Sequence, residues 1–370
     1  MKHENIDMEN DDNKVENYDK DAFVVEDGKL VSYAGDGGDV VIPEGVTSIK
    51  NWAFVNGRGL NSIIIPDSVT SIGTYAFGGC GGLHSIVVSA GNTNYRSENN
   101  CLIENATNSL ILGCPTSIIP EGVTAIGNNA FCDCIGLVAI AIPNSVSCIG
   151  DGAFYGQSGL TSIVIPKGVT SIGVAAFYGC SGLTSIIIPN SVNCIGERAF
   201  AGCSGLRSIE VDAGNTSYRS ENNCLIEKAT NALVLGCKAS AVPEGVTSIG
   251  ERAFDGCSGL TSITIPEGVI SVGCRAFENC DGLTSISFPK GMTSIDNWAF
   301  INCSGLTSIT IPEGLTPIGV GAFRGCIGLT SIMYTGTMAQ WKGISKGKVW
   351  DDCTGAYTVH CTDGDIAKGE

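Results

Sequence analysis

The sequence contains few histidines and few aromatic residues, and it has no cluster of basic residues. Three of its 370 residues are His, aromatic residues make up 7%, and the formal net charge is −16. A Ser–His or Cys–His catalytic pair needs a base beside its nucleophile, and nucleic-acid binding needs clustered Lys and Arg. The composition therefore argues against a histidine-based catalytic site and against a nucleic-acid or anionic-membrane partner.

Long apolar runs are also missing. No run approaches the roughly 18–20 apolar residues of a membrane-spanning helix, so we expect no membrane insertion. The N-terminus likewise shows no apolar core of a signal peptide. Residues 1–20 are polar, acidic and without periodicity, which predicts a flexible acidic leader. The sequence is therefore compatible with two cellular locations: the protein either remains inside the cell or was exported by a signal that has since been removed.

The sequence is rich in glycine and cysteine, and it carries a regular internal repeat. Most intervals between its marker prolines are 23 residues, as from Pro143 to Pro166, and two intervals are 54 residues, which is 23 plus 31. A unit of this size cannot bury an apolar face alone, so stacked neighbours must supply the core. The marker positions are Pro43, Pro66, Pro120, Pro143, Pro166, Pro189, Pro243, Pro266, Pro289 and Pro312.

One unit, residues 260–282, illustrates the local structure that we expect. Its start, Leu-Thr-Ser-Ile-Thr-Ile, alternates β-branched and polar residues and predicts a short strand, which Pro266 ends. The following Val-Thr-Ser-Ile predicts a second extended piece, and Ala276-Phe277 predicts one helical turn. In each first strand, the residues six, three and one before the proline should point inward. Those four and two before it should face solvent.

Two longer units of 31 residues, Ser89–Ile119 and Asp212–Val242, are near copies of each other. Each holds an Asn-Cys-Leu-Ile-Glu segment and a later Leu-Ile-Leu-Gly-Cys or Leu-Val-Leu-Gly-Cys segment around a polar turn. Two apolar segments flanking a polar turn predict a β-hairpin. We expect this hairpin to replace the helical turn of the ordinary unit, on the outer side of the solenoid.

The repeated pattern Leu-x-x-Ile-x-Ile-Pro-x-x-Val-x-x-Ile-Gly-x-x-Ala-Phe-x-x-Cys resembles the BspA-type bacterial leucine-rich repeat. The tail from Tyr334 to Asp365 resembles the closing segment of such proteins in gut bacteria. The resemblance covers most of the chain and is specific, because the pattern recurs at fixed spacing. It implies a curved solenoid, often exported to the cell surface or beyond, with adhesion to host or bacterial proteins as the usual proposed role.

We therefore expect an α/β solenoid. It should be a curved, right-handed leucine-rich-repeat superhelix with a parallel β-sheet on its concave face. The phase of the repeat gives about 13 rungs, two of which carry hairpins. The expected parts are a leader at 1–20, an N-terminal cap at 21–42, the solenoid at 43–334 and a C-terminal cap at 335–370.

The sequence holds 18 cysteines, and those of the repeat ladder are expected to be buried thiols rather than disulfides. Eight of them lie at one repeat position, fourteen residues after the marker, so they form a ladder that packs as a row of small apolar groups. Cys353 and Cys361 are the exception that a terminal cap could bridge. The ladder consists of Cys80, Cys134, Cys180, Cys203, Cys257, Cys280, Cys303 and Cys326.

We expect no cofactor and no metal site. The Cys132-x-Cys134 pair lacks a second pair of ligands for zinc, and turn chemistry explains the loop at Asp212 better than calcium does, because its copy at Ser89 lacks the acid. His84 takes a position usually held by Thr and is expected to be a surface residue, and His360 is expected to be a cap residue. The carboxylates at positions such as Glu251, Asp255 and Glu278 are expected to be solvated residues of a variable outer turn.

The position two before each marker differs between the halves of the chain. It is apolar over the first seven rungs and mostly polar afterwards, as at Glu210, Thr264 and Ser287. A contiguous exposed apolar patch usually marks an interaction site, although β-propensity alone could also select these residues. The partner-binding residues that we predict on the concave face are Val41, Ile64, Val87, Ile118, Val164 and Ile187.

These observations favour a non-catalytic protein-binding or adhesion module whose partner is a host matrix or bacterial surface protein. The alternative is a structural solenoid that forms a homodimer through the same apolar row, so the chain would be a monomer or a weak homodimer. An enzyme is disfavoured, because no catalytic set is visible in the sequence.

Overall fold

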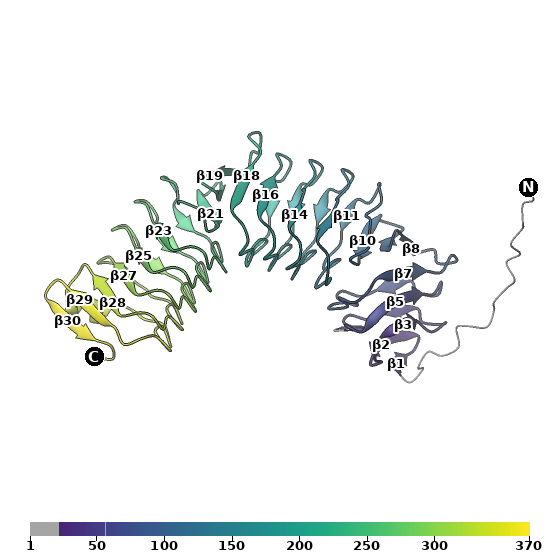
Figure 1. Ribbon diagram of the computed structural model, residues 1–370, viewed down its shortest axis with the longest axis horizontal. Helices are drawn as coiled ribbons and strands as arrows, with labels where there is room; N and C mark the ends of the chain where they lie inside the picture. Colours follow the sequence, from purple (N-terminus) through teal and green to yellow (C-terminus); the bar gives the residue numbers. More distant parts are fainter. Residues whose placement is uncertain (1–21, 56) are drawn as a thin grey trace, which may run out of the picture.

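The computed structural model describes residues 22–55 and 57–370, so the predicted leader lies outside the described residues. The chain winds into a β-solenoid of about 14 turns with little helix, and the turns stack into an arc (Figure 1). Two rows of strands line the solenoid, and hydrogen bonding divides them into seven sheets; we call the two rows the first sheet and the second sheet. Ala-Phe turns close the ordinary coils. The described part of the chain has one helix, α1 (Met338–Gly343), in the C-terminal cap.

The expected helical turn at each Ala-Phe segment was wrong, and the fold is a β-solenoid rather than α/β. The residue before Ala-Phe has a left-handed backbone, with φ of 52° at Ala175, 53° at Arg252 and 55° at Arg275. A left-handed residue cannot continue a right-handed helix. The segment therefore forms tight turns whose N–H groups bond to carbonyls of the next coil, as Phe254 N does to Ala276 O at 2.7 Å.

The first sheet is built from the predicted Leu-x-x-Ile-x-Ile strands, which pair in parallel so that each residue lies beside the one 23 positions later. Its inward residues, such as Leu60, Ile63 and Ile65, are fully buried, as predicted. The strands of this sheet and of its C-terminal extension are β3 (Gly38–Val41), β5 (Leu60–Ile65), β7 (Ser85–Val88), β12 (Ala139–Ile140), β14 (Ser162–Ile163), β16 (Ser185–Ile188), β18 (Ser208–Val211), β23 (Ser262–Thr264), β25 (Ser285–Ser287), β27 (Ser308–Ile311), β28 (Ser331–Tyr334), β29 (Thr358–Cys361) and β30 (Gly364–Ala367).

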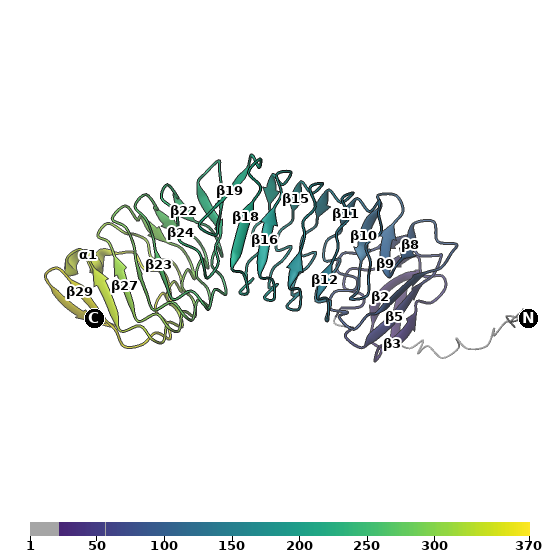
Figure 2. The ribbon, with the colours of Figure 1, turned by 45° about the horizontal axis from the view of Figure 1, so that its top comes forward.

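The second sheet is built from the predicted short extended pieces and from the hairpins. Figure 2 shows it beside the first sheet along the arc. Its strands are β1 (Phe23–Glu26), β2 (Lys29–Tyr33), β4 (Ser48–Ile49), β6 (Ser71–Ile72), β8 (Tyr95–Glu98), β9 (Cys101–Glu104), β10 (Ser109–Leu112), β11 (Ala125–Ile126), β13 (Cys148–Ile149), β15 (Ser171–Ile172), β17 (Cys194–Ile195), β19 (Tyr218–Glu221), β20 (Cys224–Glu227), β21 (Ala232–Leu235), β22 (Ser248–Ile249), β24 (Ser271–Val272) and β26 (Ser294–Ile295).

A ladder of stacked phenylalanines fills the core beneath the Ala-Phe turns. Rings in successive coils lie nearly parallel, with centroids 5.2 Å apart for Phe131–Phe154 and 5.0 Å apart for Phe254–Phe277. Burying one such side chain contributes about 2–3 kcal/mol relative to leaving it exposed. The same contact recurs in nearly every coil, so stability is spread along the solenoid rather than concentrated at one centre.

The predicted hairpin is confirmed in both long units, and each hairpin has an additional strand. β9 pairs with β10 as predicted, and β8 pairs with β9 on its other side, so each long unit adds three strands to the second sheet. A buried Asn precedes the three added strands in each long unit. Asn92 donates to the carbonyls of Pro66 and Val69 and accepts from two backbone N–H groups, and Asn215 does the same in the second long unit.

Each long unit lacks an Ala-Phe turn, so the turns on either side of it meet directly. A Cβ placed on Gly256 would lie 3.4 Å from the Cα of Gly202, which belongs to the coil before the hairpin. We call these two places the N-terminal joint and the C-terminal joint. The second sheet gains strands at each joint while the row of Ala-Phe turns loses a member, and this difference bends the solenoid toward the turns.

The bend puts the Ala-Phe turns on the inner side of the arc, and the hairpin strands β8, β10, β19 and β21 lie toward its outer edge (Figure 1). The first sheet lies on the flank between these two sides. Its predicted position on the concave face was therefore wrong, because the Ala-Phe turns lie on that face (Figure 1).

Candidate functional site

The predicted partner-binding row lies on the flank sheet rather than in the concavity. We call this set the apolar row. Its exposed members are Val164 at 76%, Ile118 at 68%, Ile187 at 53% and Val87 at 43%, whereas Val41 and Ile64 are half-buried. Neighbouring strands bring the members side by side, since Val41 pairs with Ile64 and Ile64 pairs with Val87. The row ends where Ile187 meets Glu210 on the next strand.

The N-terminal joint opens a hollow in the apolar row. The backbone N–H of Ile118 bonds to the carbonyl of Asn99 at the hairpin tip, at 3.1 Å, instead of joining a regular strand. The resulting cavity has a volume of about 680 Å³, and its walls include Ile118, Ile140 and Ala141. Glu98 and Asn99 stand at its edge. The row therefore offers an apolar hollow with a polar rim.

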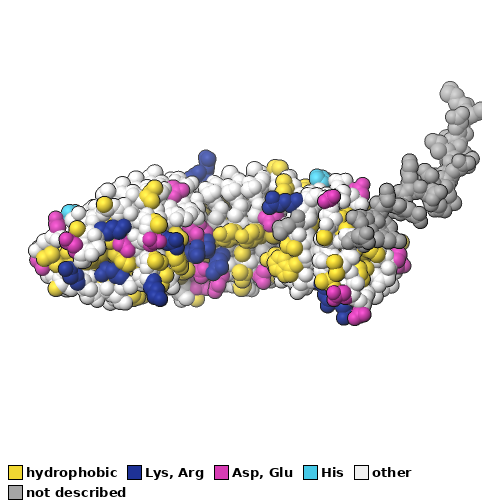
Figure 3. Space-filling model, turned by 90° about the horizontal axis from the view of Figure 1, so that it is seen from below, with side chains coloured by type: hydrophobic (Ala, Val, Ile, Leu, Met, Phe, Trp, Pro, Cys, Tyr) yellow, Lys and Arg dark blue, Asp and Glu magenta, His cyan; other side chains and the backbone are white. Residues whose placement is uncertain are grey.

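The inner side of the arc carries aromatic and charged side chains that the sequence did not mark as a site. Figure 3 looks into this side and shows Lys, Arg, Asp and Glu mixed with hydrophobic side chains along its middle. Trp52 stacks on Tyr75 with ring centroids 4.3 Å apart, and Tyr155 stacks on Tyr178 at 5.0 Å. These residues flank the buried Ala-Phe pairs, so each coil contributes to a continuous inner surface.

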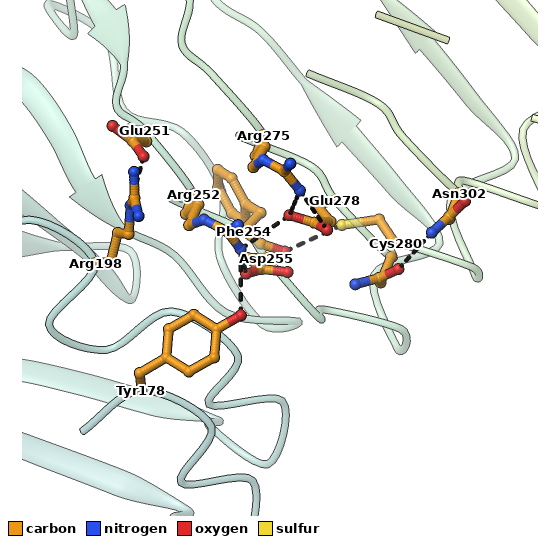
Figure 4. Close-up of polar contacts among 11 residues, drawn as sticks. Tyr178, Arg198, Glu251, Arg252, Phe254, Asp255, Arg275, Glu278, Cys280 and Asn302 are labelled. Atoms are coloured by element: carbon orange, nitrogen blue, oxygen red, sulfur yellow. Dashed lines mark hydrogen bonds and ion pairs between the residues drawn. The ribbon is translucent and has the colours of Figure 1, made fainter. Parts of the chain in front are cut away.

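A charged cluster lies on this inner side at the C-terminal joint (Figure 4). Arg252 contacts both Asp255 and Glu278, with 2.9 Å from Nη1 to the Glu278 carboxylate, and Arg275 also bonds to Glu278 at 2.9 Å. The guanidinium of Arg252 lies over the Tyr178 ring, 5.6 Å from its centroid. Two carboxylates thus share the guanidinium of Arg252.

The cluster corrects the expectation that these carboxylates are solvated surface residues. Asp255 is 5% exposed, and the Glu278 side chain is also mostly buried. Burial raises the pKa of Asp255 from 3.8 to about 6, opposed by Arg252 and reinforced by Glu278. Burial disfavours the charged form of a carboxyl group, and here it outweighs the attraction of the guanidinium.

A cleft lies at each joint, between the Ala-Phe turns and the second sheet. The cleft at the N-terminal joint has a volume of about 180 Å³ and that at the C-terminal joint about 210 Å³. Both have apolar floors made of a Phe and the last hairpin strand. The mouth residues at corresponding positions are Thr74, Tyr75, Asn128 and Asn129 in the N-terminal cleft, and Glu197, Arg198, Glu251 and Arg252 in the C-terminal cleft.

The two clefts therefore share a shape and differ in charge. The C-terminal mouth carries four charged side chains, and Arg198 bonds to Glu251 across it at 2.6 Å. The N-terminal mouth carries none. Among the described residues, two buried side-chain atoms lack a hydrogen-bond partner, Asn129 Oδ1 and Arg252 Nε, and each belongs to a residue that lines one of the two clefts.

The eight ladder cysteines are buried free thiols, as predicted. Most of them donate a hydrogen bond to the Phe carbonyl of the preceding coil, as Cys280 Sγ does to Phe254 O at 3.1 Å. Burial raises the pKa of Cys80 to about 12, so this thiol stays protonated and unreactive. Cys353 and Cys361, for which the sequence left a bridge open, are both free thiols.

The two described histidines lie on or beside strands of the first sheet. His84 is exposed on the flank sheet, and His360 lies on β29 of the C-terminal cap beside Asp365, with 2.9 Å between Nδ1 and Oδ1. Across residues 22–55 and 57–370, no helix is long and apolar enough to cross a membrane.

The fold and its repeated surfaces are those of a leucine-rich-repeat solenoid. The family model for the BspA type leucine rich repeat region matches residues 36–111, 108–225 and 235–345, in six copies. The chain therefore belongs to the BspA-type leucine-rich-repeat family, as its repeat predicted. This family and fold consist of repeat proteins that are generally non-enzymatic.

Solved structures of bacterial proteins share the fold. A leucine rich cell surface protein from Faecalibacterium prausnitzii A2-165 is 29% identical, with a TM-score of 0.59 over 87% of this chain and 95% of that chain. The pneumococcal vaccine antigen PcpA shares the fold at 20% identity, with a TM-score of 0.59 over 90% of this chain and 81% of that one. None of the curated proteins matches the chain significantly.

Proposed function

We propose that the chain is a non-catalytic protein-binding and adhesion module that engages a host or bacterial surface protein through the apolar row. The main support is the exposure of this row, because Ile118, Val164 and Ile187 present large apolar side chains to solvent at the same position of three coils. A monomeric protein rarely exposes a contiguous apolar patch unless it binds a partner. The hollow at Ile118 supplies a pocket for an apolar anchor residue of that partner, which is how interface hot spots are commonly built.

The proposal includes a place at the cell surface or outside the cell. Its support is the family and the Faecalibacterium relative, which is described as a leucine rich cell surface protein. An adhesion role also suits the net charge of −16, which disfavours binding to anionic nucleic acid.

The test is binding of the full chain to a panel of host matrix and bacterial surface proteins by biolayer interferometry. The variant Ile118→Arg/Val164→Arg/Ile187→Arg places three charges in the row. The matched control Thr264→Arg/Ser287→Arg/Thr310→Arg places the same charges at the same strand position in the C-terminal half, where the residues are already polar.

The proposal predicts saturable binding that the row variant loses by at least tenfold and that the control retains. Equal binding by the row variant and the control would move the site away from the apolar row. Absence of binding, combined with a concentration-dependent dimer that the row variant abolishes in sedimentation, would favour the homodimer instead.

A further inference from the structure

The hollow in the apolar row exposes a core residue that other coils bury. Its walls are residues 117–121 on one side and residues 139–144 on the other. Ile140 is an inward-pointing residue of β12, yet it is only half-buried, whereas its counterpart Ile186 is 1% exposed. The volume of about 680 Å³ lies within the range of ligand pockets, roughly 300–1,000 Å³. The hollow can therefore admit a side chain of a bound molecule down to the core.

The strand beside the hollow, β12, has an open edge. It pairs in parallel with β14, and in the described part of the chain no strand pairs with its other side. In regular coils the carbonyl two residues before the marker proline faces the preceding coil, as Ile64 O accepts from Ile42 N at 3.0 Å. The equivalent carbonyl of Ala141 receives no such bond from the preceding coil. Because the backbone groups alternate along a strand, those of Ala139 face the same way.

These open backbone groups lie within reach of a second chain. Ala139 and Ala141 are both exposed, and both line the hollow. Unpaired N–H and C=O groups at a strand edge are a template for another strand. An extended peptide that adds to such an edge gains main-chain hydrogen bonds, and pockets for its alternate side chains give specificity. The hollow supplies one such pocket, because Ile118 and Ile140 line it.

The rim of the hollow is acidic. Glu98 and Glu121 line it, and among its described lining residues none is Lys or Arg. Arg96 lies 3.7 Å from Glu98, with side chains that are 36% and 49% exposed, so this ion pair is weak and open to exchange. A bound segment that carries Lys or Arg beside its apolar residue is therefore favoured over an acidic segment.

The C-terminal joint shares the acidic rim but has a more polar lining. Its equivalents of the two rim residues are Glu221 and Glu244. Ile263, the equivalent of Ile140, is 8% exposed, so the core is covered there. At three lining positions, Ala241, Ser262 and Thr264 stand in place of Ile118, Ala139 and Ala141. The C-terminal joint therefore supplies a matched control for each feature of the hollow.

We propose that β12 binds an extended peptide segment of the partner protein, which pairs with the open edge through main-chain hydrogen bonds. One apolar side chain of the segment enters the hollow and packs against Ile118 and Ile140. Lys or Arg residues beside it face Glu98 and Glu121. This inference rests on the proposed function, because it specifies how a protein partner is recognised at the apolar row.

The test begins with a phage-displayed library of random linear dodecapeptides, selected on the full chain. The most enriched peptide is synthesised unmodified, with Glu in place of its Lys and Arg residues, and with N-methyl groups on alternate residues. N-methylation removes backbone N–H donors and keeps the side chains. Two N-methylated forms are needed, one for each edge of the peptide, because only one edge faces β12. Fluorescence anisotropy measures the affinity of each form for the unaltered protein.

Three pairs of protein variants locate the bound peptide. Each pair makes one change at the N-terminal joint and the same change at the equivalent residue of the C-terminal joint. Proline removes an N–H donor from the strand edge, arginine blocks the hollow, and lysine reverses the charge of the rim. The pairs are Ala141→Pro with Thr264→Pro, Ile118→Arg with Ala241→Arg, and Glu121→Lys with Glu244→Lys.

The proposal predicts enriched peptides that alternate apolar and polar residues and carry Lys or Arg. One N-methylated form and the Glu-substituted form should each bind at least tenfold more weakly than the unmodified peptide, and the other N-methylated form should bind equally well. Each variant at the N-terminal joint should weaken binding at least tenfold, while its partner at the C-terminal joint binds as the wild type does. The proposal is overturned if no peptide is enriched, if both N-methylated forms bind like the unmodified peptide, or if the two joints respond equally.

The same peptide separates a failure of this proposal from a failure of the proposed function. A panel protein that binds through the apolar row but is not displaced by the peptide would overturn the strand pairing and leave the adhesion module standing. Peptide binding at β12 without binding of any panel protein would support the strand pairing and count against adhesion to the proteins of the panel.

Discussion

The two joints of the solenoid share their backbone features and differ in the charge of the side chains at the mouths of their clefts. In each, a buried Asn begins the hairpin, and a Gly at the end of the last strand accepts the ring of the next Phe. A Cβ on Gly113 would lie 2.0 Å from Phe131 Cε1, and one on Gly236 would lie 2.1 Å from Phe254 Cε1. The mouths differ, because Tyr75 and Asn129 correspond to Arg198 and Arg252.

This difference shows that geometry and chemistry are set by separate positions of the repeat. The hairpin and its Gly fix where the chain bends and how wide the cleft is. The residues beside each Ala-Phe pair point onto the inner surface, where their identity changes no backbone contact. The C-terminal joint therefore carries a cluster of charged side chains that pair largely with one another. The mouth of the cleft at the N-terminal joint is neutral.

The largest predicted contrast is between Arg252→Met and Asn129→Met, the same change in each joint. Removing Arg252 leaves Asp255 and Glu278 buried without their shared cation, so we expect a loss of about 3–5 kcal/mol in the free energy of unfolding. Removing Asn129 eliminates an unpaired buried acceptor, so the loss should stay below about 1 kcal/mol. Urea unfolding measures both, and equal losses would show that the charged cluster does not stabilise its joint.

The second contrast concerns pH. The pKa of folded Asp255 is raised to about 6 from 3.8, so between these values the folded state binds more protons than the unfolded chain. The free energy of unfolding therefore falls as pH rises through this window. Relative to Asp255→Asn, the wild type should lose about 2 kcal/mol between pH 4 and pH 7.

Cys132 occupies the corresponding position in the N-terminal joint and supplies the control for this pH effect. Burial raises the pKa of its thiol to about 12, so Cys132→Ala should leave the pH dependence between 4 and 7 unchanged. A pH profile of Asp255→Asn parallel to that of the wild type would disprove the assignment of the raised pKa to Asp255.

The third prediction tests what the joints share. Gly113→Ala and Gly236→Ala each force a methyl group into the ring of the next Phe, and overpacking of this kind costs about 1–3 kcal/mol. The two losses should agree within about 0.5 kcal/mol, because the surrounding contacts are the same. Thermal unfolding of both variants measures them, and a clear inequality would mean that the two frames are not equivalent.

The smallest effect is expected at the mouth of the C-terminal cleft. The Arg198 and Glu251 side chains are 46% and 31% exposed, so their ion pair should contribute no more than about 1 kcal/mol. Arg198→Met should therefore change stability slightly at low salt and less at 1 M NaCl, where the Debye length is about 3 Å. A larger loss that persists at 1 M NaCl would contradict the solvent-exposed geometry.

The repeating features of this molecule could be predicted from its sequence, because each leaves the same residue at a fixed spacing. Strand alternation, the marker prolines, the cysteine ladder and the β9–β10 hairpin all fall in this class. β8 could not be predicted as readily, since Tyr95-Arg-Ser-Glu has no regular apolar alternation. The burial of Asp255 was missed because it depends on Arg252 and on a second carboxylate from the next coil.

The direction of the bend was also missed, for a physical reason. It depends on which side of the coil loses a layer, and a 31-residue unit looks longer than its neighbours in sequence even though it lacks one turn in space. The prediction placed the apolar row on the concave side together with the first sheet. The sequence did contain a signal for the missing turn, because neither Ser89–Ile119 nor Asp212–Val242 contains the Ala-Phe pair.

The missing Ala-Phe turn bends the solenoid and opens a cleft at each joint. The most direct test replaces residues 89–119 with a copy of residues 143–165, an ordinary 23-residue unit in the same phase, and measures the shape by small-angle X-ray scattering. The account predicts a straighter particle with a larger maximum dimension than the wild type. An unchanged scattering profile at long range would contradict it.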